Sequence, residues 1–388
     1  MAVFDFFATV PRHMELLLAE ELQQLGARDV QHTVAGVAFT GPLEVGYRAV
    51  LWSRLANTVL VQLKSFPAAT PEELYDGARQ IPWDKHLGID STFAVTFTTI
   101  RSEITHTKYG ALKVKDAVVD QFREAFNKRP SIELNQPDVR INCHVDKDEA
   151  TLSIDLAGDS LHRRSYRQSS GKAPLKENVA AALLLRAKWP RMAAEKKPIV
   201  DPMCGSGTIL IEAALMAADH APGLLRDYFG FQGWRQHNQS VWQKLIDEAE
   251  KRRLAGIKNL GTYRGSDINK SVIRDAQKNV EAAGLQDFIH LDRQSIAEIT
   301  PPSKTTPPGL VVTNAPYGER LGDDEEAVAL HRELGAVLKE KFPGWKASVF
   351  TGSEELGFKL GMRAHKIYKL YNGSLECLLL NFDIRDRD

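Results

Sequence analysis

The chain has 388 residues, of which 43% are hydrophobic and 26% are charged. This composition is ordinary for a globular protein of two or three domains, and it excludes a disordered tail, a collagen-like fibre and a disulfide-stapled miniprotein. Fifty basic and fifty acidic side chains give a formal charge of zero, which argues mildly against a nucleic-acid partner. The N-terminus has no basic segment, and no apolar run approaches the ~20 residues that a membrane span needs. We therefore expect a soluble, cytoplasmic protein without a membrane partner.

The three cysteines Cys143, Cys204 and Cys377 are far apart and lack the spacing of metal ligands. We expect three reduced thiols and no metal site.

Residues 1–65 predict a small α+β domain. Its four strands and two helices follow in the order strand, helix, strand pair, helix, strand, which is typical of a ferredoxin-like domain. These elements are expected at residues 6–10, 14–25, 30–39, 43–55 and 58–64. Residues 66–158 form a second predicted block, with a strand at 93–99, a helix at 111–126 and a hairpin of strands 141–145 and 151–155.

The stretch 160–197 differs sharply in charge from the rest of the chain. It holds ten Lys and Arg residues against Glu177 and Glu195, a net charge of +8. We place a domain boundary here, with residues 159–197 as a basic linker and the first helix of the next domain.

Residues 198–388 alternate strands with helices, which predicts a parallel sheet covered on both faces. The strands are expected at 198–201, 263–267, 288–292, 310–314 and 347–351, and the helices at 208–219, 271–283, 327–342 and 354–360. The end of the chain differs, because Asn372-Gly373 predicts a hairpin turn between strands 367–370 and 375–382. The prediction is a mixed sheet of seven strands that ends in an antiparallel hairpin.

The first strand of this domain leads into a glycine-rich turn. Residues 199–212, IVDPMCGSGTILIE, read as an apolar strand ending at Asp201, a turn carrying Gly205 and Gly207, and an apolar helix. Glycines let backbone N–H groups approach a ligand, and the helix N-terminus adds positive potential. The third glycine of dinucleotide folds and the lysine of phosphate-binding loops are absent. Asp201 instead suits a cationic amino-acid ligand.

A second motif follows the fourth strand. Residues 311–321, VVTNAPYGERL, place Asn314, Ala315, Pro316 and Tyr317 at the end of an apolar strand. The amide oxygen of Asn314 and the carbonyl of Ala315 can accept both N–H bonds of an exocyclic base amine, while Tyr317 can stack on a base turned out of its helix. These four residues are the predicted catalytic group, and they act by positioning the amine.

Both motifs resemble known sequences. DPMCGSGT is similar to the S-adenosylmethionine loop of class I methyltransferases that act on exocyclic amines of nucleic-acid bases, and NAPY is similar to their Asn/Asp/Ser-Pro-Pro-Tyr/Phe motif. Ala315 departs from that pattern by replacing the first proline, which makes the backbone less rigid. Over the whole chain, six segments in one order resemble the THUMP-containing bacterial rRNA guanine-N2 methyltransferases of the RlmL type. These segments are YGALKVKDAVVD (109–120), GDSLHRRSYR (158–167), APLKENVAAALL (173–184), DPMCGSGTILIEAA (201–214), GFQGW (230–234) and NAPYGERL (314–321).

The resemblance implies an α+β N-terminal region, ferredoxin-like plus a THUMP RNA-binding domain, followed by an α/β class I methyltransferase fold. It implies S-adenosylmethionine as cofactor, with Asp267 on the ribose and Asp292 or Ser295 near the adenine. The full cofactor-binding set is Asp201, Pro202, Cys204, Gly205, Gly207, Thr208, Asp267, Asp292, Ser295 and Asn314. In some bacteria this unit is fused to a second methyltransferase domain, whose activity we expect to be absent from these 388 residues.

The implied substrate is 23S rRNA or a precursor of the large ribosomal subunit, with no obligatory protein partner. In that light a set of basic and aromatic residues becomes the predicted RNA-binding group. Its members are Lys113, Lys115, Arg163, Arg164, Tyr166 and Arg167.

Two other functions stay open from the sequence. The Asn314 motif serves adenine N6 as well as guanine N2, so an adenine methyltransferase on RNA or DNA is one alternative. Ala315 alone favours the other, a non-catalytic RNA-binding factor for ribosome assembly. No cysteine lies near Asn314, which argues against the covalent route used to methylate ring carbons.

Overall fold

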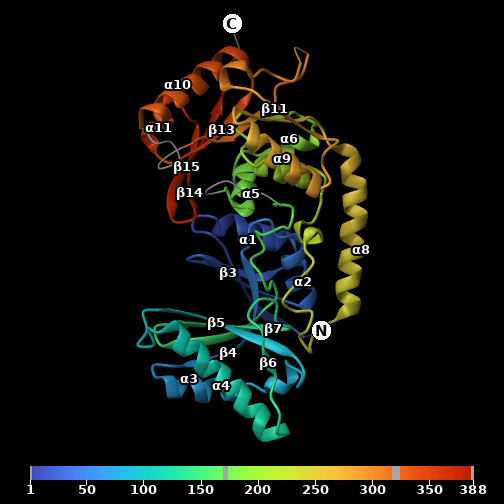
Figure 1. Cartoon of the computed structure of the whole chain (residues 1–388), viewed down its shortest axis with the longest axis vertical. Helices are drawn as coiled ribbons and strands as arrows, with labels where there is room; N and C mark the ends of the chain where they lie inside the picture. Colours follow the sequence, from blue (N-terminus) through green and yellow to red (C-terminus); the bar gives the residue numbers. More distant parts are fainter. Residues whose placement is uncertain (1, 169–173, 304, 317–323, 386–388) are drawn as a thin grey trace. The chain divides into compact units, whose positions relative to one another are not determined.

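The computed structural model describes residues 2–168, 174–303, 305–316 and 324–385 (Figure 1). The chain divides into two compact units that are not continuous in sequence. The first unit contains the residues before Pro11 together with Leu18–Leu161 and Arg226–Ile246, and the second contains Pro11–Leu17, His162–Leu225 and the residues after Ile246.

The first unit is built on one sheet of eight strands in the order β2-β3-β1-β4-β8-β7-β5-β6. The strands are β1 (Phe4–Thr9), β2 (Arg28–Thr33), β3 (Gly36–Gly41), β4 (Thr58–Pro67), β5 (Thr92–Ile100), β6 (Ser131–Ile132), β7 (Val139–Asp146) and β8 (Glu149–Asp155). The helices of this unit are α1 (Glu15–Gln24), whose first three residues fall in the second unit, α2 (Leu43–Trp52), α3 (Pro71–Arg79) and α4 (Thr107–Phe126), with a short 3-10 turn, η1 (Trp83–Lys85).

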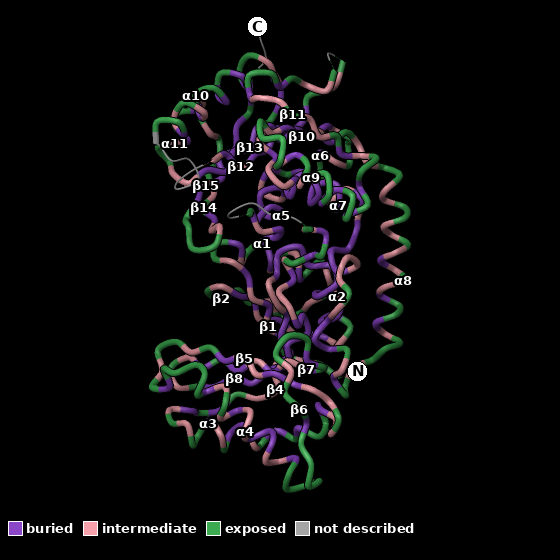
Figure 2. The backbone as a smooth tube through the Cα atoms, viewed as in Figure 1, coloured by how far each residue is buried: buried purple, intermediate pink, exposed green. Residues whose placement is uncertain are grey.

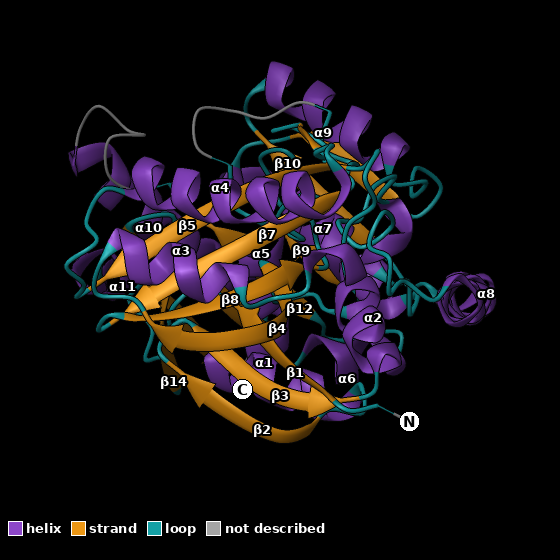
Figure 3. Cartoon of the chain, turned by 90° about the horizontal axis from the view of Figure 1, so that it is seen from below, coloured by secondary structure: helices purple, strands orange, loops and turns teal. Residues whose placement is uncertain are grey.

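The long strand β4 joins the two predicted N-terminal domains. Its first residues pair with β1, and its length from Leu60 to Pro67 pairs with β8. The predicted boundary between residues 65 and 66 therefore falls inside a strand, and the two domains share one sheet. Beside it, α3 and α4 pack together next to β4 and β5 (Figure 3). The sequence analysis missed α3, although Thr70 and Glu73 form a capping box at its start and Pro71 occupies the first turn.

Residues Arg226–Ile246 correct the predicted domain range 198–388. This segment leaves the second unit and contributes its aromatic side chains to the core of the first. The ring of Tyr47 packs 4.6 Å from that of Phe231, and the Trp234 indole N–H donates a 2.9 Å hydrogen bond to Nδ1 of His86. Arg226 donates to the carbonyl oxygens of Ala157, Asp159 and Ser160. Large aromatic rings are stabilised by burial in a hydrophobic core, and the core of the first unit buries these rings.

The second unit is built on a sheet of seven strands in the order β11-β10-β9-β12-β13-β15-β14. The strands are β9 (Ile199–Asp201), β10 (Tyr263–Asp267), β11 (Ile289–Arg293), β12 (Leu310–Asn314), β13 (Lys346–Thr351), β14 (Lys366–Asn372) and β15 (Leu375–Asp383). The first five are parallel, and β15 runs antiparallel to both β13 and β14. The predicted mixed sheet with its terminal hairpin is confirmed.

Helices surround this sheet. They are α5 (Glu177–Arg186), α6 (Trp189–Ala194), α7 (Thr208–Ala217), α9 (Lys270–Ala282), α10 (Asp324–Lys341) and α11 (Glu354–Lys359), with 3-10 turns η2 (Pro222–Leu225), η3 (Ile257–Asn259) and η4 (Ile296–Glu298). The 18-residue helix α8 (Gln239–Gly256), which the sequence analysis did not predict, contains the boundary between the units at residue 246. None of the described helices is long and apolar enough to cross a membrane.

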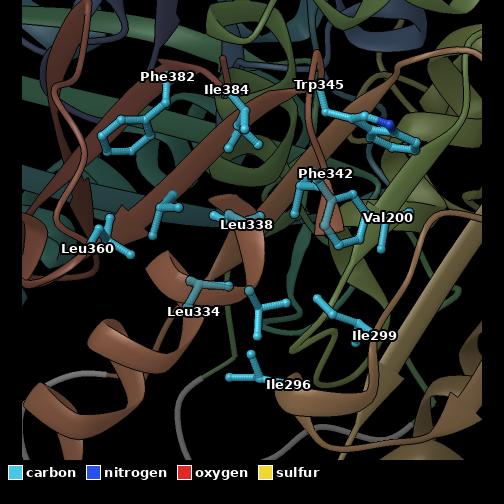
Figure 4. Packing of buried hydrophobic residues seen from close by; sticks show 14 of the residues in the cluster. Val200, Ile296, Ile299, Leu334, Leu338, Phe342, Trp345, Leu360, Phe382 and Ile384 are labelled. Atoms are coloured by element: carbon cyan, nitrogen blue, oxygen red, sulfur yellow. The ribbon is translucent and has the colours of Figure 1, made fainter. Parts of the chain in front are cut away.

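One face of the second sheet is sealed by α10. Leu334, Leu338 and Phe342 recur every four residues and are all fully buried, so they form the single apolar face expected of such spacing. They pack in one cluster with strand residues such as Val311 and Phe382 (Figure 4). The neighbouring strands β12 and β13 are correspondingly buried along most of their length (Figure 2).

Candidate functional site

A glycine-rich loop connects β9 to α7 at the carboxyl edge of the second sheet. Gly205 and Gly207 have φ angles of +54° and +81°, a region that favours glycine. A Cβ placed on Gly205 would meet no atom within 4 Å, so the loop borders open space. The backbone N–H of Cys204 donates to the carbonyl of Ser266 at 2.9 Å, which ties this loop to the end of β10. The predicted strand, turn and helix are all present, and they leave room for a ligand over the turn.

Asp201 is the last residue of β9, and one oxygen of its buried carboxyl group lacks a well-formed hydrogen bond. Its side chain is 1% exposed, and Oδ1 accepts a 3.2 Å hydrogen bond from the N–H of Met203. Burial raises the pKa of Asp201 to about 7; the hydroxyl of Thr313 and the Met203 N–H oppose that rise, and the charge of Asp267 adds to it. Oδ2 has no hydrogen bond of acceptable geometry to a described residue. A buried carboxyl of this kind is stabilised by an added donor or cation.

The adjacent strand β12 ends in two further buried oxygens. Oγ1 of Thr313 and Oδ1 of Asn314 are inaccessible to solvent; the Thr313 hydroxyl faces the Asp201 carboxyl group, whereas Asn314 Oδ1 has no hydrogen-bond partner among the described residues. Because β12 lies beside β9 and parallel to it, these oxygens share the sheet edge with Asp201. Buried polar atoms are nearly always hydrogen-bonded in proteins. Asp201 Oδ2 and Asn314 Oδ1, which lack a well-formed hydrogen bond to any described residue, indicate a place where a ligand supplies the missing donors.

Asp267 lies at the end of β10, next to the same loop. Its Oδ2 accepts from the N–H of Gly205 at 3.3 Å and its Oδ1 from the N–H of Asn269 at 2.9 Å. The N-cap of α9 is Asn269 rather than Asp267, so Asp267 is not explained as a helix cap. The next residue, Ile268, is 68% exposed. An acid followed by an uncovered apolar side chain suits a ligand with a hydroxylated part and a flat apolar part.

The two candidates at β11 already have partners within the chain. Asp292 accepts a 3.0 Å hydrogen bond from the guanidinium of Arg264, and Ser295 caps η4 in a reciprocal arrangement with Glu298. Either could contact a ligand only alongside these bonds. A role for Asp292 or Ser295 stays a prediction.

The structure corrects two predicted RNA contacts. Arg164 and Tyr166 are each 1% exposed. The guanidinium of Arg164 pairs with Glu212 of α7, and the Tyr166 hydroxyl donates to the same carboxylate at 2.9 Å. Both side chains are core groups that neutralise a buried glutamate, and no RNA can reach them. Arg163, which directly precedes Arg164, is exposed and remains a candidate RNA contact.

Arg167 has an assignment that the sequence analysis missed. Its guanidinium donates to the hydroxyls of Ser206 and Thr208, at 3.1 and 3.0 Å, and to the carbonyl of Leu175 at 2.9 Å. Its Nε also pairs with Glu177 at 2.8 Å. Four bonds from one fork hold it against the glycine-rich loop and away from solvent. Arg167 therefore supports the loop, and it is not placed to contact RNA directly.

Asn279 of α9 fixes the same loop from the other side. Its amide donates to the carbonyl of Ser206 at 3.0 Å and accepts from the N–H of Gln168 at 2.8 Å. It is fully buried on the apolar face that also holds Ile273, Ala276 and Val280. A polar residue at a core position of an amphipathic helix was the signal that could have identified it.

The remaining predicted residues divide between the two units. In the second unit, Pro202 and Thr208 are buried in the loop, and Ala315 is fully buried in the apolar cluster of Figure 4 while its N–H donates to the carbonyl of Phe350. Pro316 follows it, half-buried, and Tyr317 lies outside the described residues. Burial raises the pKa of the Cys204 thiol well above its usual range. That thiol is protonated and does not act as a nucleophile.

Lys113 and Lys115 belong to α4 of the first unit. Both are half-buried: Lys113 lies 3.8 Å from Glu72 and over the ring of Tyr109, and Lys115 pairs with Asp116 at 2.7 Å. Their role in binding RNA stays a prediction.

Three family models match the chain along its length. Residues 164–381 match the RMKL-like methyltransferase domain, residues 68–155 the THUMP domain, and residues 5–60 the RlmL ferredoxin-like domain. The crystal structure of SMU.472, a methyltransferase solved with S-adenosylhomocysteine, is 31% identical, covers all of both chains and has a TM-score of 0.88. A protein from Listeria monocytogenes, described as a predicted N6-adenine-specific DNA methylase, is 33% identical with a TM-score of 0.85, over 99% of this chain and 97% of that one.

Curated relatives show higher identity. The ribosomal RNA large subunit methyltransferases K/L of Methylococcus capsulatus and Syntrophotalea carbinolica are each 52% identical, over 98% and 100% of this chain. The chain spans about half the length of these relatives, 51% and 54% respectively. The match at residues 164–381 covers more than half of the chain, so the chain belongs to the family of RMKL-like methyltransferase domains, here combined with THUMP and RlmL ferredoxin-like domains.

Proposed function

We propose that the chain transfers a methyl group from S-adenosylmethionine to the exocyclic N2 amine of a guanine in 23S rRNA. The observation that carries the proposal is the pair of buried oxygens without a well-formed hydrogen bond, Asp201 Oδ2 and Asn314 Oδ1, at one sheet edge. The family of the methyltransferase domain and the rRNA methyltransferase names of the relatives agree with it. An rRNA substrate also fits the predicted cytoplasmic location.

The residues around the glycine-rich loop fit S-adenosylmethionine. The cofactor carries an ammonium group, a ribose with two hydroxyls and an adenine ring. Asp201 offers a buried carboxyl oxygen for a cation, Asp267 offers a carboxylate for hydroxyls, and Ile268 offers an exposed apolar surface for the ring. The open space above Gly205 leaves the backbone N–H groups of the turn accessible. When bound, the cofactor supplies a methyl group on a positively charged sulfur.

Asn314 positions the amine that receives the methyl group. The nitrogen of an exocyclic amine is a weak nucleophile because its lone pair is delocalised into the ring. The side-chain oxygen of Asn314 and the carbonyl of Ala315 would accept its two N–H bonds and direct the lone pair at the methyl group. Holding the reacting atoms in this way can account for a large part of a rate enhancement. As the C–N bond forms, the bond between the methyl carbon and the cofactor sulfur would break with its electron pair kept by sulfur, S-adenosylhomocysteine would leave, and the nitrogen would release one proton to water.

No covalent intermediate with the protein is part of the proposal. The thiol at Cys204 is buried and protonated, and the other described cysteines, Cys143 and Cys377, are buried as well. The family pattern with proline in place of Ala315 is stiffer, but the Ala315 methyl group packs fully into the α10 cluster. Packing therefore holds this backbone in place of the missing proline ring.

One assay tests the proposal against its alternatives. The chain is incubated with labelled S-adenosylmethionine and deproteinised 23S rRNA, large ribosomal subunits or DNA, and the labelled nucleoside is identified after digestion. We expect N2-methylguanosine from rRNA. N6-methyladenosine would replace our proposal with the adenine activity named for the Listeria relative. Cofactor binding without label in any substrate would instead indicate a non-catalytic RNA-binding protein.

A further inference from the structure

The second unit has a hollow of about 640 Å³ that the methyl-transfer site does not use. It lies between the α5–α6 connection and the strands β13 and β15. Its lining includes five basic side chains, Arg186, Lys188, Arg191, Lys197 and Lys346, and one carboxylate, Glu195. We propose that this hollow, here called the basic hollow, binds the phosphate backbone of an RNA segment remote from the target guanine. This inference rests on the proposed RNA substrate.

The hollow lies at the opposite edge of the sheet from Asn314. Lys346 is the first residue of β13 and pairs with Leu310, the first residue of β12, whereas Asn314 is the last residue of β12. Four residues of strand at ~3.3 Å each separate the two levels by about 13 Å. A ligand in the basic hollow is therefore distinct from the cofactor and the target base, and both edges fall within reach of one folded RNA.

The basic side chains of the hollow are only partly neutralised by the protein. Glu195 pairs with Lys197 at 2.9 Å and with Arg191 at 3.7 Å, and Asp383 pairs with Lys346 at 2.9 Å. Lys188 is exposed and makes no ion pair with any described residue. Arg191 is 87% exposed despite its pairing. The positive charge that remains is available to a polyanion.

Arg186 provides a second, independent indication of an anionic ligand. Its guanidinium lies over the ring of Tyr368, 4.5 Å from the centroid, which fixes it in place. Its Nε is buried and has no hydrogen-bond partner among the described residues. A buried donor of a charged group normally has an acceptor. A phosphate oxygen would supply one.

The floor of the hollow is rigid and polar. Ser348 donates to Oδ1 of Asn381 at 2.9 Å, and the amide of Asn381 donates to the carbonyl of Arg186 at 3.0 Å. These bonds fix the end of α5 against β15. They hold the chain around Arg186 in place, which would keep its guanidinium positioned for a phosphate contact that fixes register and not sequence.

The basic hollow also contains several of the positively charged side chains of residues 160–197. Arg164 and Arg167 are turned inward to Glu212 and Glu177. Lys188, Arg191 and Lys197 line the hollow instead. A stretch with a net charge of +8 thus provides both internal pairing and one localised cationic surface.

The test removes two exposed charges and measures RNA binding. Lys188→Asn is combined with Arg191→Gln; asparagine is chosen because residue 188 has a φ of +63°, which asparagine tolerates. We expect the affinity for deproteinised 23S rRNA at 0.1 M salt to fall by about tenfold, and the slope of log affinity against log salt to become shallower by about 1.5, since each lost phosphate contact contributes roughly 0.7–0.9. KM for RNA should rise while kcat stays within about twofold.

The matched control removes two charges elsewhere on the same unit. Lys251→Gln with Lys258→Gln changes two exposed lysines that do not line the hollow. It should leave the RNA affinity and the salt slope unchanged. In both variants S-adenosylhomocysteine affinity and Tm should match the unsubstituted chain, which shows that the fold is intact.

The outcomes separate this inference from the proposed function. If the unsubstituted chain methylates rRNA and the double variant binds RNA with equal affinity and slope, the basic hollow is not an RNA site, and a protein segment becomes the better candidate for it. An equal loss in the control would also overturn the inference, because a general charge effect would explain it. If the unsubstituted chain neither binds nor methylates RNA, the proposed function fails and this inference fails with it.

Discussion

Two buried polar clusters in the second unit contain similar groups in opposite states. In the first cluster Glu212, on α7, is fully buried, pairs with Arg164 and accepts a hydrogen bond from Tyr166. In the second cluster Asp201 and Asn314, at the carboxyl ends of β9 and β12, each have a buried oxygen with no partner among the described residues. Asp201 is as buried as Glu212 and Asn314 is less so, but the two clusters differ in whether their buried oxygens have hydrogen-bond partners.

The difference separates structure from function. A buried charge with all its partners present is best explained by the fold, because the cluster is complete without a ligand. A buried oxygen without a partner destabilises the ligand-free chain by about 1–3 kcal/mol. The fold retains such an oxygen where a ligand will occupy it. The comparison agrees with a structural role for Glu212 and with the roles in binding and chemistry that we propose for Asp201 and Asn314.

The largest effect is expected from Glu212→Leu. It leaves the buried guanidinium of Arg164 without its carboxylate, so the free energy of unfolding of the second unit should fall by about 3–5 kcal/mol. Urea unfolding followed by circular dichroism measures the loss. The double variant Arg164→Met with Glu212→Leu removes both charges and should recover most of it. A double variant as unstable as the single one would contradict a structural ion pair.

The second largest effect should come from Asn314→Ala, and it should be confined to activity. Methyl transfer should fall by about 100- to 1,000-fold, since a positioned polar group is lost from the reaction site. Affinity for S-adenosylhomocysteine, measured by calorimetry, should stay within about threefold. Asn259→Ala, at an exposed position of the same unit, is the matched control and should retain full activity. Undiminished transfer in Asn314→Ala would refute its catalytic role.

Local patterns in the sequence were enough to predict much of this site. The turn at Gly205 and Gly207 is encoded by neighbouring residues, as is the strand that ends at Asn314, and the Asn372-Gly373 hairpin follows from turn chemistry alone. Contacts between distant residues were not predictable in this way. A run of arginines at residues 163–167 reads as surface charge, and only the fold shows that Arg164 meets Glu212, 48 residues further along.

The N-terminal half shows the same limit. The strands were predicted, but nothing in residues 58–67 indicates that one strand will pair with both β1 and β8 and so merge two domains. The aromatic rings of residues 226–246 belong to the first unit through distant partners such as Tyr47 and His86, which no local pattern indicates.

The third prediction uses pH to compare the clusters. The pKa of Asp201 is raised to about 7 by burial, whereas the unfolded chain loses this proton near 3.8. Between these values the folded state binds more protons than the unfolded state, so the contribution of Asp201 to stability is greatest at low pH and is lost as pH rises toward 7. Asp201→Asn should therefore stabilise the ligand-free chain by about 2 kcal/mol more at pH 8 than at pH 5.

Thermal unfolding of both proteins at the two pH values measures this difference. Asp201→Asn should also bind S-adenosylmethionine more weakly, because the carboxylate that would face the ammonium group is gone. An equal change in stability at pH 5 and pH 8 would show that the folded chain does not raise the pKa of Asp201. The same pair of measurements on Tyr166→Phe, in the satisfied cluster, should give no difference between the two pH values.

The smallest effect is expected from Arg167→Lys. This variant tests whether a side chain whose hydrogen bonds are all made within the protein still contributes to cofactor binding. The Arg167 guanidinium reaches Ser206, Thr208 and Leu175 at once, and a single ammonium group cannot reproduce that fork. The loop should become less ordered, so KM for S-adenosylmethionine should rise about tenfold while kcat stays within about twofold and Tm falls only slightly. Arg163→Lys, at an exposed position four residues away, should change none of these values. If Arg167→Lys lowers Tm and leaves KM unchanged, Arg167 belongs with Glu212 among the purely structural groups, because its bonds would then support the fold without shaping the cofactor loop.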